Sequence, residues 1–125
     1  MQNSWLQKQK KVEKIFYLGM LEEGSVQHNI WKKQYSSFGA MMSFTIKGGE
    51  KEAFTFLNNL KLIKLAVSLG STESLAEHPA SMTHADVSAE EKNRLGISDA
   101  LVRISIGVEH FEDIIWDIEQ ALEKV

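Results

Sequence analysis

Residues 101–122 read LVRISIGVEHFEDIIWDIEQAL and contain the clearest change of periodicity in the chain. Within residues 101–106, Val102, Ile104 and Ile106 share one face, and this period of two predicts a strand. The apolar residues that follow are spaced as on one face of a helix, and they are Phe111, Ile114, Ile115, Ile118 and Leu122. A strand that leads into an amphipathic helix favours a domain in which helices pack on a sheet.

The preceding sequence repeats this alternation of strand and helix patterns. Earlier strand patterns occupy residues 12–18, 39–47 and 62–69. Helix patterns occupy residues 25–35, 50–60 and 88–95, and residues 4–11 are compatible with the tail of another helix. We therefore expect an α+β two-layer sandwich, in which a small, mostly antiparallel sheet carries helices on one face.

The composition limits the class of protein. The chain has 125 residues, 43% hydrophobic and 25% charged, which is enough material for one compact domain. A net charge of -3 with interspersed signs provides neither a basic field for nucleic acid nor a cationic face for a membrane surface. The chain contains no cysteine, no apolar run of the ~20 residues that a membrane span needs and no signal-peptide pattern, which predicts a cytoplasmic protein.

Most of the unusually placed polar residues lie in residues 68–103. Arg103 belongs to the predicted strand but points away from its more apolar face. A planar guanidinium in that position can hold a carboxylate by two parallel hydrogen bonds, so Arg103 is a candidate anion clamp. The residues alone favour the alternative that Arg103 pairs with a nearby acid such as Asp99 or Glu109.

The histidines lack the spacing of zinc ligands, so we expect no metal site; they are His28, His78, His84 and His110. His78 and His84 flank Ser81 and Thr83, which allows a hydrolase-like pair of serine and base to be considered. The strand-turn-helix setting of such a nucleophile is not recognisable in the sequence. The favoured interpretation is therefore a loop histidine whose hydrogen bonds are satisfied.

Three motifs in the second half of the chain resemble a single enzyme family. They are SLGSTESL (68–75), EHPASMTH (77–84) and LVRISIGVE (101–109). Together they resemble the carboxy-terminal domain of the Cys/Met-metabolism pyridoxal-phosphate enzymes, which include methionine γ-lyase, cystathionine γ-lyase and γ-synthase, and O-acetylhomoserine sulfhydrylase. The resemblance extends from about Val12 to Leu122. It implies that residues 1–125 form the single C-terminal, substrate-covering domain of a fold type I pyridoxal-phosphate (PLP) enzyme.

The resemblance also implies roles for individual residues. Arg103 matches the family arginine that binds the α-carboxylate of the substrate. Ser68 matches a serine beside the cofactor-lysine linkage and that carboxylate, Leu69 supplies an adjacent backbone contact, and Thr83 matches a threonine near the same site. Val67 stands where cystathionine γ-lyases typically carry glutamate, so its apolar side chain favours a thioether without a second charged end.

The resemblance implies PLP as the cofactor, but nothing in the chain resembles the family's Schiff-base lysine motif, phosphate-binding segment or pyridine-binding aspartate. Those parts belong to the family's large domain, which we expect upstream, so the isolated chain should be inactive and should not bind PLP. The complete protein is expected to be a homo-oligomeric lyase or transferase, a tetramer as in the family. It would be methionine γ-lyase-like (γ-elimination) or an O-acetylhomoserine sulfhydrylase (γ-replacement), with a sulfur amino acid or an O-acylhomoserine as substrate. The alternative is a stand-alone binding or assembly module that kept this scaffold and lost catalysis.

Overall fold

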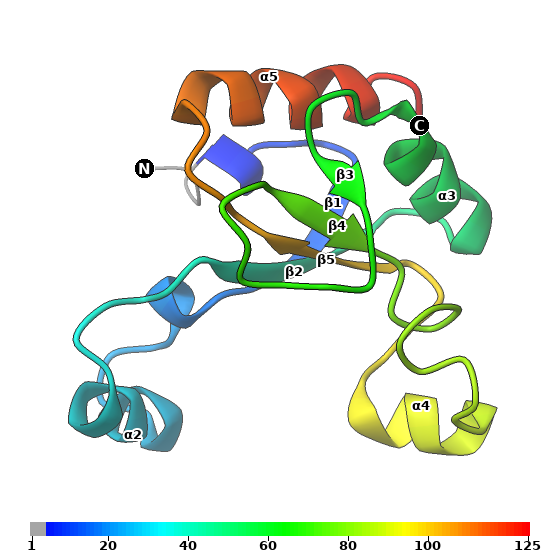
Figure 1. The fold of residues 1–125 in the computed structure, drawn as a ribbon. Coiled ribbons are helices and arrows are strands. Elements are labelled where there is room, and N and C mark those ends of the chain that lie inside the picture. Colours follow the sequence, from blue (N-terminus) through cyan, green and yellow to red (C-terminus); the bar gives the residue numbers. More distant parts are fainter. Residues whose placement is uncertain (1–4) are drawn as a thin grey trace.

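The computed structural model of the chain describes residues 5–125 (Figure 1). Within these residues, one five-stranded sheet has the strand order β1-β2-β5-β4-β3. The strands are β1 (Val12–Phe16), β2 (Met41–Ile46), β3 (Lys64–Leu65), β4 (Leu75–Glu77) and β5 (Leu101–Ser105). The β3–β4 pair is parallel and the other three pairs are antiparallel, which confirms the prediction of a small, mostly antiparallel sheet.

Two helices form the second layer of the sandwich. They are α3 (Glu50–Asn59) and α5 (Phe111–Leu122), which cover one face of the sheet (Figure 1). A short 3-10 helix η1 (Leu18–Met20), helix α2 (Val26–Gln34) and helix α4 (Ala89–Leu95) complete the fold. Neither α2 nor α4 contains a buried residue, and both project away from the two layers. The predicted α+β two-layer sandwich is therefore confirmed, with α3 and α5 as the helices of its second layer.

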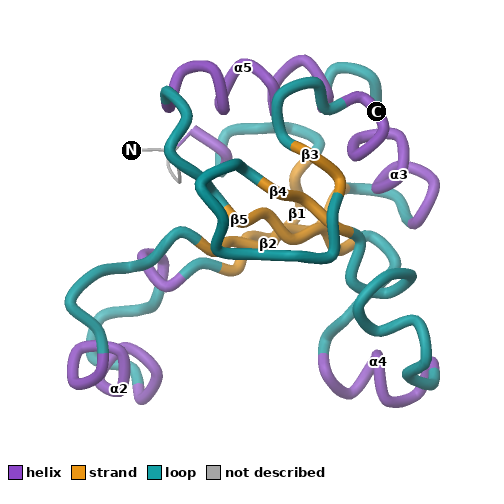
Figure 2. The backbone as a smooth tube through the Cα atoms, in the orientation of Figure 1, coloured by secondary structure: helices purple, strands orange, loops and turns teal. Residues whose placement is uncertain are grey.

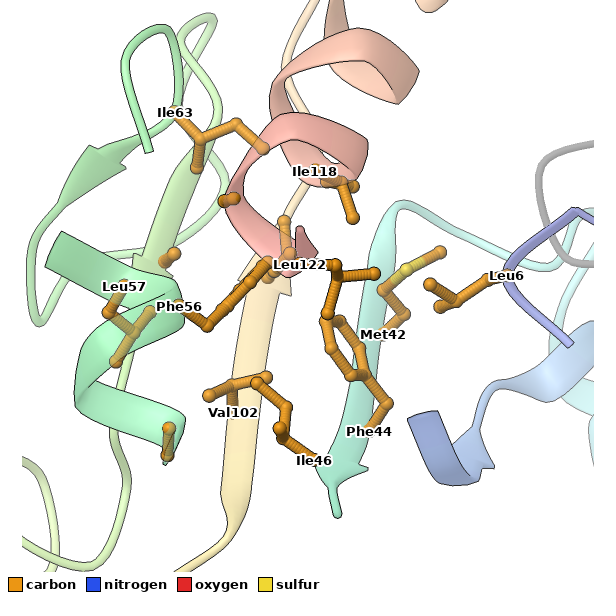
Figure 3. Close-up of a cluster of buried hydrophobic side chains, with 14 of the residues drawn as sticks. Leu6, Met42, Phe44, Ile46, Phe56, Leu57, Ile63, Val102, Ile118 and Leu122 are labelled. Carbon is orange, nitrogen blue, oxygen red and sulfur yellow. The ribbon is translucent and has the colours of Figure 1, made fainter. Parts of the chain in front are cut away.

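The core lies between the sheet and the layer of α3 and α5 (Figure 3). Phe44 from β2 and Phe56 from α3 are both fully buried and meet edge to face, with 5.6 Å between their ring centroids. Leu6, from the amino-terminal segment, is 2% exposed and joins the same cluster. Burial of each such large apolar side chain contributes about 1.5–3 kcal/mol to the stability of the fold. The strand and helix patterns of apolar residues decide the fold because they determine which side chains are buried.

A buried carboxylate joins α5 to the segment before β3. Asp117 is fully buried, and its two oxygens accept hydrogen bonds from the backbone N–H groups of Lys61, Leu62 and Ile63 at 2.7, 2.8 and 2.8 Å. The sequence analysis did not identify this residue, because Asp117 interrupts an apolar stripe and its partners are more than 50 positions away. Asp117 fixes the path by which the chain enters β3.

Capping residues define the ends of α2 and α4. The hydroxyl oxygen of Ser25 accepts the His28 N–H at the start of α2, and that of Ser88 accepts the Glu91 N–H at the start of α4. Gly96 ends α4 with a φ of 75°, a left-handed conformation that glycine adopts at little cost. The Glu91 side chain pairs with Arg94 one turn later and does not form a capping box with Ser88.

The α2 region is held by aromatic contacts outside the core. Trp31 stacks on Phe38 with 4.6 Å between ring centroids, and Tyr17 lies 6.2 Å from the same ring. The Trp31 indole N–H also donates to the Ser37 carbonyl at 3.0 Å. These contacts fold the segment between β1 and β2 back on itself.

The largest departures from the expected elements lie between residues 62 and 88. Of the predicted strand 62–69, only Lys64 and Leu65 pair with a neighbour, because the chain then leaves the sheet as a loop. Strand β4 was not predicted, since its three residues are all buried and show no alternation. Figure 2 shows long loops after β3 and after β4, and these loops carry the candidate site. None of the helices in the described part of the chain is long and apolar enough to cross a membrane.

Candidate carboxylate-binding site

The pairing of β4 with β5 places a glutamate opposite Arg103. Glu77 is the register partner of Arg103 across this antiparallel pair. The two side chains lie on the same face of the sheet, with 2.7 Å between Arg103 Nη1 and Glu77 Oε1. The Arg103 side chain is 19% exposed and that of Glu77 only 1%. Because Val102 and Ile104 fill the core on the other face, Arg103 points away from it, as the alternation predicts.

The loop after β3 is tied to β5 at two points. Arg103 Nη2 donates to the carbonyl oxygens of Ser68 at 3.2 Å and Val67 at 3.4 Å. Two residues further along β5, the Ser105 hydroxyl oxygen accepts the Gly70 N–H at 2.8 Å. The structure thus brings Ser68 and Val67 to Arg103. Leu69 lies between these anchors in the same loop, with its residue surface 54% exposed.

Thr83 joins the site from the loop after β4. Its hydroxyl donates to Glu77 Oε1 at 3.1 Å, so Thr83 and Arg103 contact the same carboxylate oxygen. The Thr83 hydroxyl oxygen also lies 2.8 Å from His84 Nδ1. Of the residues singled out from the sequence, Arg103 and Thr83 contact Glu77, which the sequence analysis missed, and Ser68 contacts Arg103. The signal for Glu77 is its register with Arg103, and that register requires knowledge of β4.

The acids expected to pair with Arg103 have other partners. The backbone carbonyl of Asp99 accepts from His78 Nε2 at 2.7 Å. The Glu109 carboxylate accepts the Ser74 N–H at 2.6 Å and the Ser74 hydroxyl at 2.7 Å. Burial acts to raise the pKa of Glu109, but these hydrogen bonds from Ser74 together outweigh it and leave the pKa below its ordinary value. The expectation that Arg103 pairs with a nearby acid is therefore confirmed, but the acid is Glu77 and neither Asp99 nor Glu109.

His78 has the satisfied environment that the sequence analysis favoured. It is fully buried, packs edge to face on Phe54, and its Nδ1 lies 2.7 Å from the Ser81 hydroxyl. Because a carbonyl oxygen can only accept, Nε2 donates to Asp99, and Nδ1 is paired with the Ser81 hydroxyl. Both ring nitrogens are thus occupied. In the described residues, no three His, Cys, Asp or Glu side chains gather so as to hold a metal ion.

Arg103 also lines an apolar groove of about 680 Å³ on the side of the sheet that α3 and α5 leave uncovered. The groove lies between β1, η1, α2 and β2, and its wall includes Phe16, Ile30, Trp31 and Met41. Arg103 is the charged residue of this lining, and no lysine or carboxylate accompanies it within the described chain. The groove offers no amine for a Schiff base and no carboxylate for a pyridine nitrogen, so it does not by itself fit PLP.

Comparison with known proteins identifies the family. Residues 2–123 match the family described as Cys/Met metabolism PLP-dependent enzyme. The chain is 54% identical over 121 residues to an L-methionine gamma-lyase of Fusobacterium nucleatum subsp. polymorphum, covering 97% of this chain and 30% of that protein. It is 47% identical over 121 residues to a cystathionine gamma-lyase of Dictyostelium discoideum, covering 97% of this chain and 31% of that protein.

A solved structure shows the same architecture. The cystathionine gamma synthase of Xanthomonas oryzae pv. oryzae, crystallised with aminoacrylate and cysteine, superposes with a TM-score of 0.86 at 40% identity. The match covers 97% of this chain and 31% of that chain. The chain thus spans about a third of the length of the relatives it matches. From its sequence, its fold and this structural neighbour, the chain belongs to the Cys/Met metabolism PLP-dependent enzymes and has the α+β fold of their C-terminal domain.

Proposed function

We propose that residues 1–125 act as the substrate-covering C-terminal domain of a PLP-dependent enzyme that transforms a sulfur amino acid. The observation that carries this proposal is Arg103, a residue that lines an apolar groove and whose guanidinium is held by Glu77 and the carbonyl of Ser68. A fixed guanidinium beside apolar side chains suits a ligand with a carboxylate at one end and an apolar thioether at the other. The PLP-binding domain belongs to another part of the enzyme.

In this proposal the chain binds and orients the substrate. Arg103 binds the α-carboxylate through the N–H groups that are not bonded to Glu77 or to the carbonyls of Ser68 and Val67. The Ser68 hydroxyl and the Leu69 N–H supply further donors around the same carboxylate, since the loop of Ser68 and Leu69 contacts Arg103. Thr83 belongs to the same site through the hydrogen bond from its hydroxyl to Glu77 Oε1. The cofactor would be held by the rest of the enzyme, where it would supply an electron sink for the reaction. The complete enzyme is a homo-oligomer, a tetramer, in this proposal.

Val67 supports a preference among substrates. Its side chain is apolar, and the residue surface is 54% exposed beside the loop that contacts Arg103. An apolar side chain there offers no partner to a second charged end, such as the distal amino-acid group of cystathionine. We therefore propose methionine γ-lyase-like elimination, or replacement on an O-acylhomoserine as in O-acetylhomoserine sulfhydrylase.

A chimeric enzyme tests the proposal. In the Fusobacterium L-methionine gamma-lyase, the 121 matching residues are exchanged for those of this chain, and the release of thiol from methionine is measured in the presence of PLP. The proposal predicts an active chimera. Arg103→Ala should lower kcat/KM by about a hundredfold, because removing one member of a charge-paired contact costs roughly 3 kcal/mol.

The matched control is Arg94→Ala. Arg94 is the other arginine of the chain, it lies in α4 with its side chain 71% exposed, and it pairs only with Glu91 one turn away. Its loss should leave kcat/KM unchanged, since exposed ion pairs contribute about 0–1 kcal/mol to stability. Retention of near-normal activity in Arg103→Ala would refute the clamp. A folded but inactive chimera would favour the alternative of a non-catalytic binding or assembly module.

A further inference from the structure

Glu77 is an unusual residue for its position in the sheet. It lies in β4 between two other strands, its side chain is 1% exposed, and its neighbours in the strand are the buried Leu75 and Ala76. A carboxylate buried at this depth is costly unless its partners compensate for lost hydration. Here the partners are Arg103 and Thr83, two of the residues that the proposed function assigns to carboxylate binding.

The contacts of Glu77 are made by one oxygen. Oε1 accepts from both Arg103 Nη1 and the Thr83 hydroxyl, whereas Oε2 is buried and has no hydrogen-bond partner in the described residues. A bidentate ion pair would use both carboxylate oxygens and two nitrogens of the guanidinium. The single-oxygen contact therefore fixes the arginine without occupying the paired N–H groups that a second carboxylate requires.

The other contacts of Arg103 also hold the guanidinium and leave part of it open. Nη2 is directed to the carbonyl oxygens of Ser68 and Val67, so two sides of the guanidinium are held by the protein. Within the described chain, Nε has no acceptor in the contacts of Arg103, and the side chain retains 19% exposure. Glu77 and the carbonyls of Ser68 and Val67 therefore orient the guanidinium and leave its Nε edge open.

From these contacts we infer that Glu77 is the positioning residue of the carboxylate clamp. Its Oε1 accepts from Arg103 Nη1 and from the Thr83 hydroxyl, and so fixes the orientation in which the Arg103 guanidinium faces an incoming α-carboxylate. Glu77 does not touch the substrate and acts through Arg103. This inference rests on the proposed function, since it assigns to Glu77 the preparation of a site that Arg103 completes.

The first test is a direct measurement of Arg103 in the 125-residue chain. In ¹⁵N-resolved spectra, a guanidinium whose Nη groups are fixed gives an Nε–H signal that is shifted from that of free arginine. Glu77→Leu, which keeps the volume but removes the acceptor, should return this signal to the free-arginine position. Glu77→Gln should retain it, because an amide oxygen can accept from both donors. The backbone amide spectrum reports whether each variant is folded.

The second test is kinetic and uses the chimera described above. Glu77→Leu should raise KM for methionine about tenfold or more, the effect of losing one oriented charged contact, with a smaller change in kcat. Glu77→Gln should restore KM to within about threefold. Glu73→Gln, an exposed acid of the preceding loop, is the matched control and should change neither parameter.

The outcomes separate this inference from the proposed function. If Arg103→Ala lowers kcat/KM while folded Glu77→Leu leaves KM and the Nε–H signal unchanged, the positioning role is overturned and the proposed function stands. If neither variant affects the chimera, the proposed function itself fails. If Glu77→Leu does not fold, the Glu77→Gln variant tests the positioning role instead. A folded Glu77→Gln variant whose Nε–H signal moves to the free-arginine position overturns the inference.

Discussion

Replacement of Asp117 by alanine tests the account of how the loop that carries Ser68 is positioned. The substitution removes the acceptor of three backbone N–H groups in residues 61–63. The N–H of Ile63 is buried, whereas those of Lys61 and Leu62 are partly buried and can recover a water molecule. The loss is therefore concentrated on Ile63.

The size of the effect follows from these contacts. A buried donor left without a partner costs about 1–3 kcal/mol, and each partly wet donor about half as much. The higher helix propensity of alanine returns about 0.5 kcal/mol in α5. The net cost is about 1.5–5.5 kcal/mol with a centre near 3.5, a large part of the ~5–15 kcal/mol that stabilises a typical domain.

Urea denaturation of the 125-residue chain measures this cost. With an m value of about 1.5 kcal/mol/M, Asp117→Ala should lower the midpoint by about 2 M. The urea midpoint of Asp117→Asn should lie between those of the wild type and Asp117→Ala. Its amide oxygen can keep the bonds to Leu62 and Ile63, whereas its NH₂ group faces the Lys61 donor. Glu119→Ala, an exposed acid of the same helix, is the control and should change stability by less than about 0.5 kcal/mol. A loss below about 1 kcal/mol for Asp117→Ala would refute the role of these hydrogen bonds.

Three further predictions concern the loops and the site. In the chimera, Val67→Glu should move the preference from methionine toward cystathionine, and an unchanged ratio of the two kcat/KM values would remove the specificity argument. Gly107→Ala should lower the thermal midpoint, because the added Cβ would lie 2.3 Å from the Thr72 carbonyl oxygen, and an unchanged midpoint would mean that the loop yields freely. The lowered pKa of Glu109 means that its contribution to stability is present above the ordinary glutamate pKa, near 4.3, and is lost as the pH falls through the lower folded value. Ser74→Ala should flatten this acid-side loss in pH-dependent denaturation, and an unaltered profile would contradict the assignment.

The sequence predicts the long, half-buried elements well. Strand β5 alternates because one face meets the core, and α5 repeats its apolar residues because one stripe meets the sheet, so both follow from burial alone. The direction of Arg103, away from Val102 and Ile104, follows from the same alternation. The gathering of Ser68 and Thr83 was implied by family resemblance, and their contacts with Arg103 or Glu77 agree with it.

The features that the sequence does not predict depend on distant partners. Glu77 is recognisable as the partner of Arg103 only when the register of β4 on β5 is known, and β4 is too short to show a period. Asp117 resembles any polar residue within a helix until residues 61–63 are placed against it. In both cases a buried charge is explained by groups from another element, and local periodicity contains no information about them.

The two sides of the groove differ in how firmly they are held. The sheet side, formed by β2 and β5, shares its backbone with the core, so its amides should exchange with solvent only when the whole domain unfolds. Helix α2 has no buried residue and depends on Trp31, Phe38 and Tyr17 for its attachment. Its amides should therefore exchange through local opening, on a much shorter timescale. A ligand that orders α2 would spend part of its binding energy on that ordering, so affinity for the groove depends on folding as well as on contact.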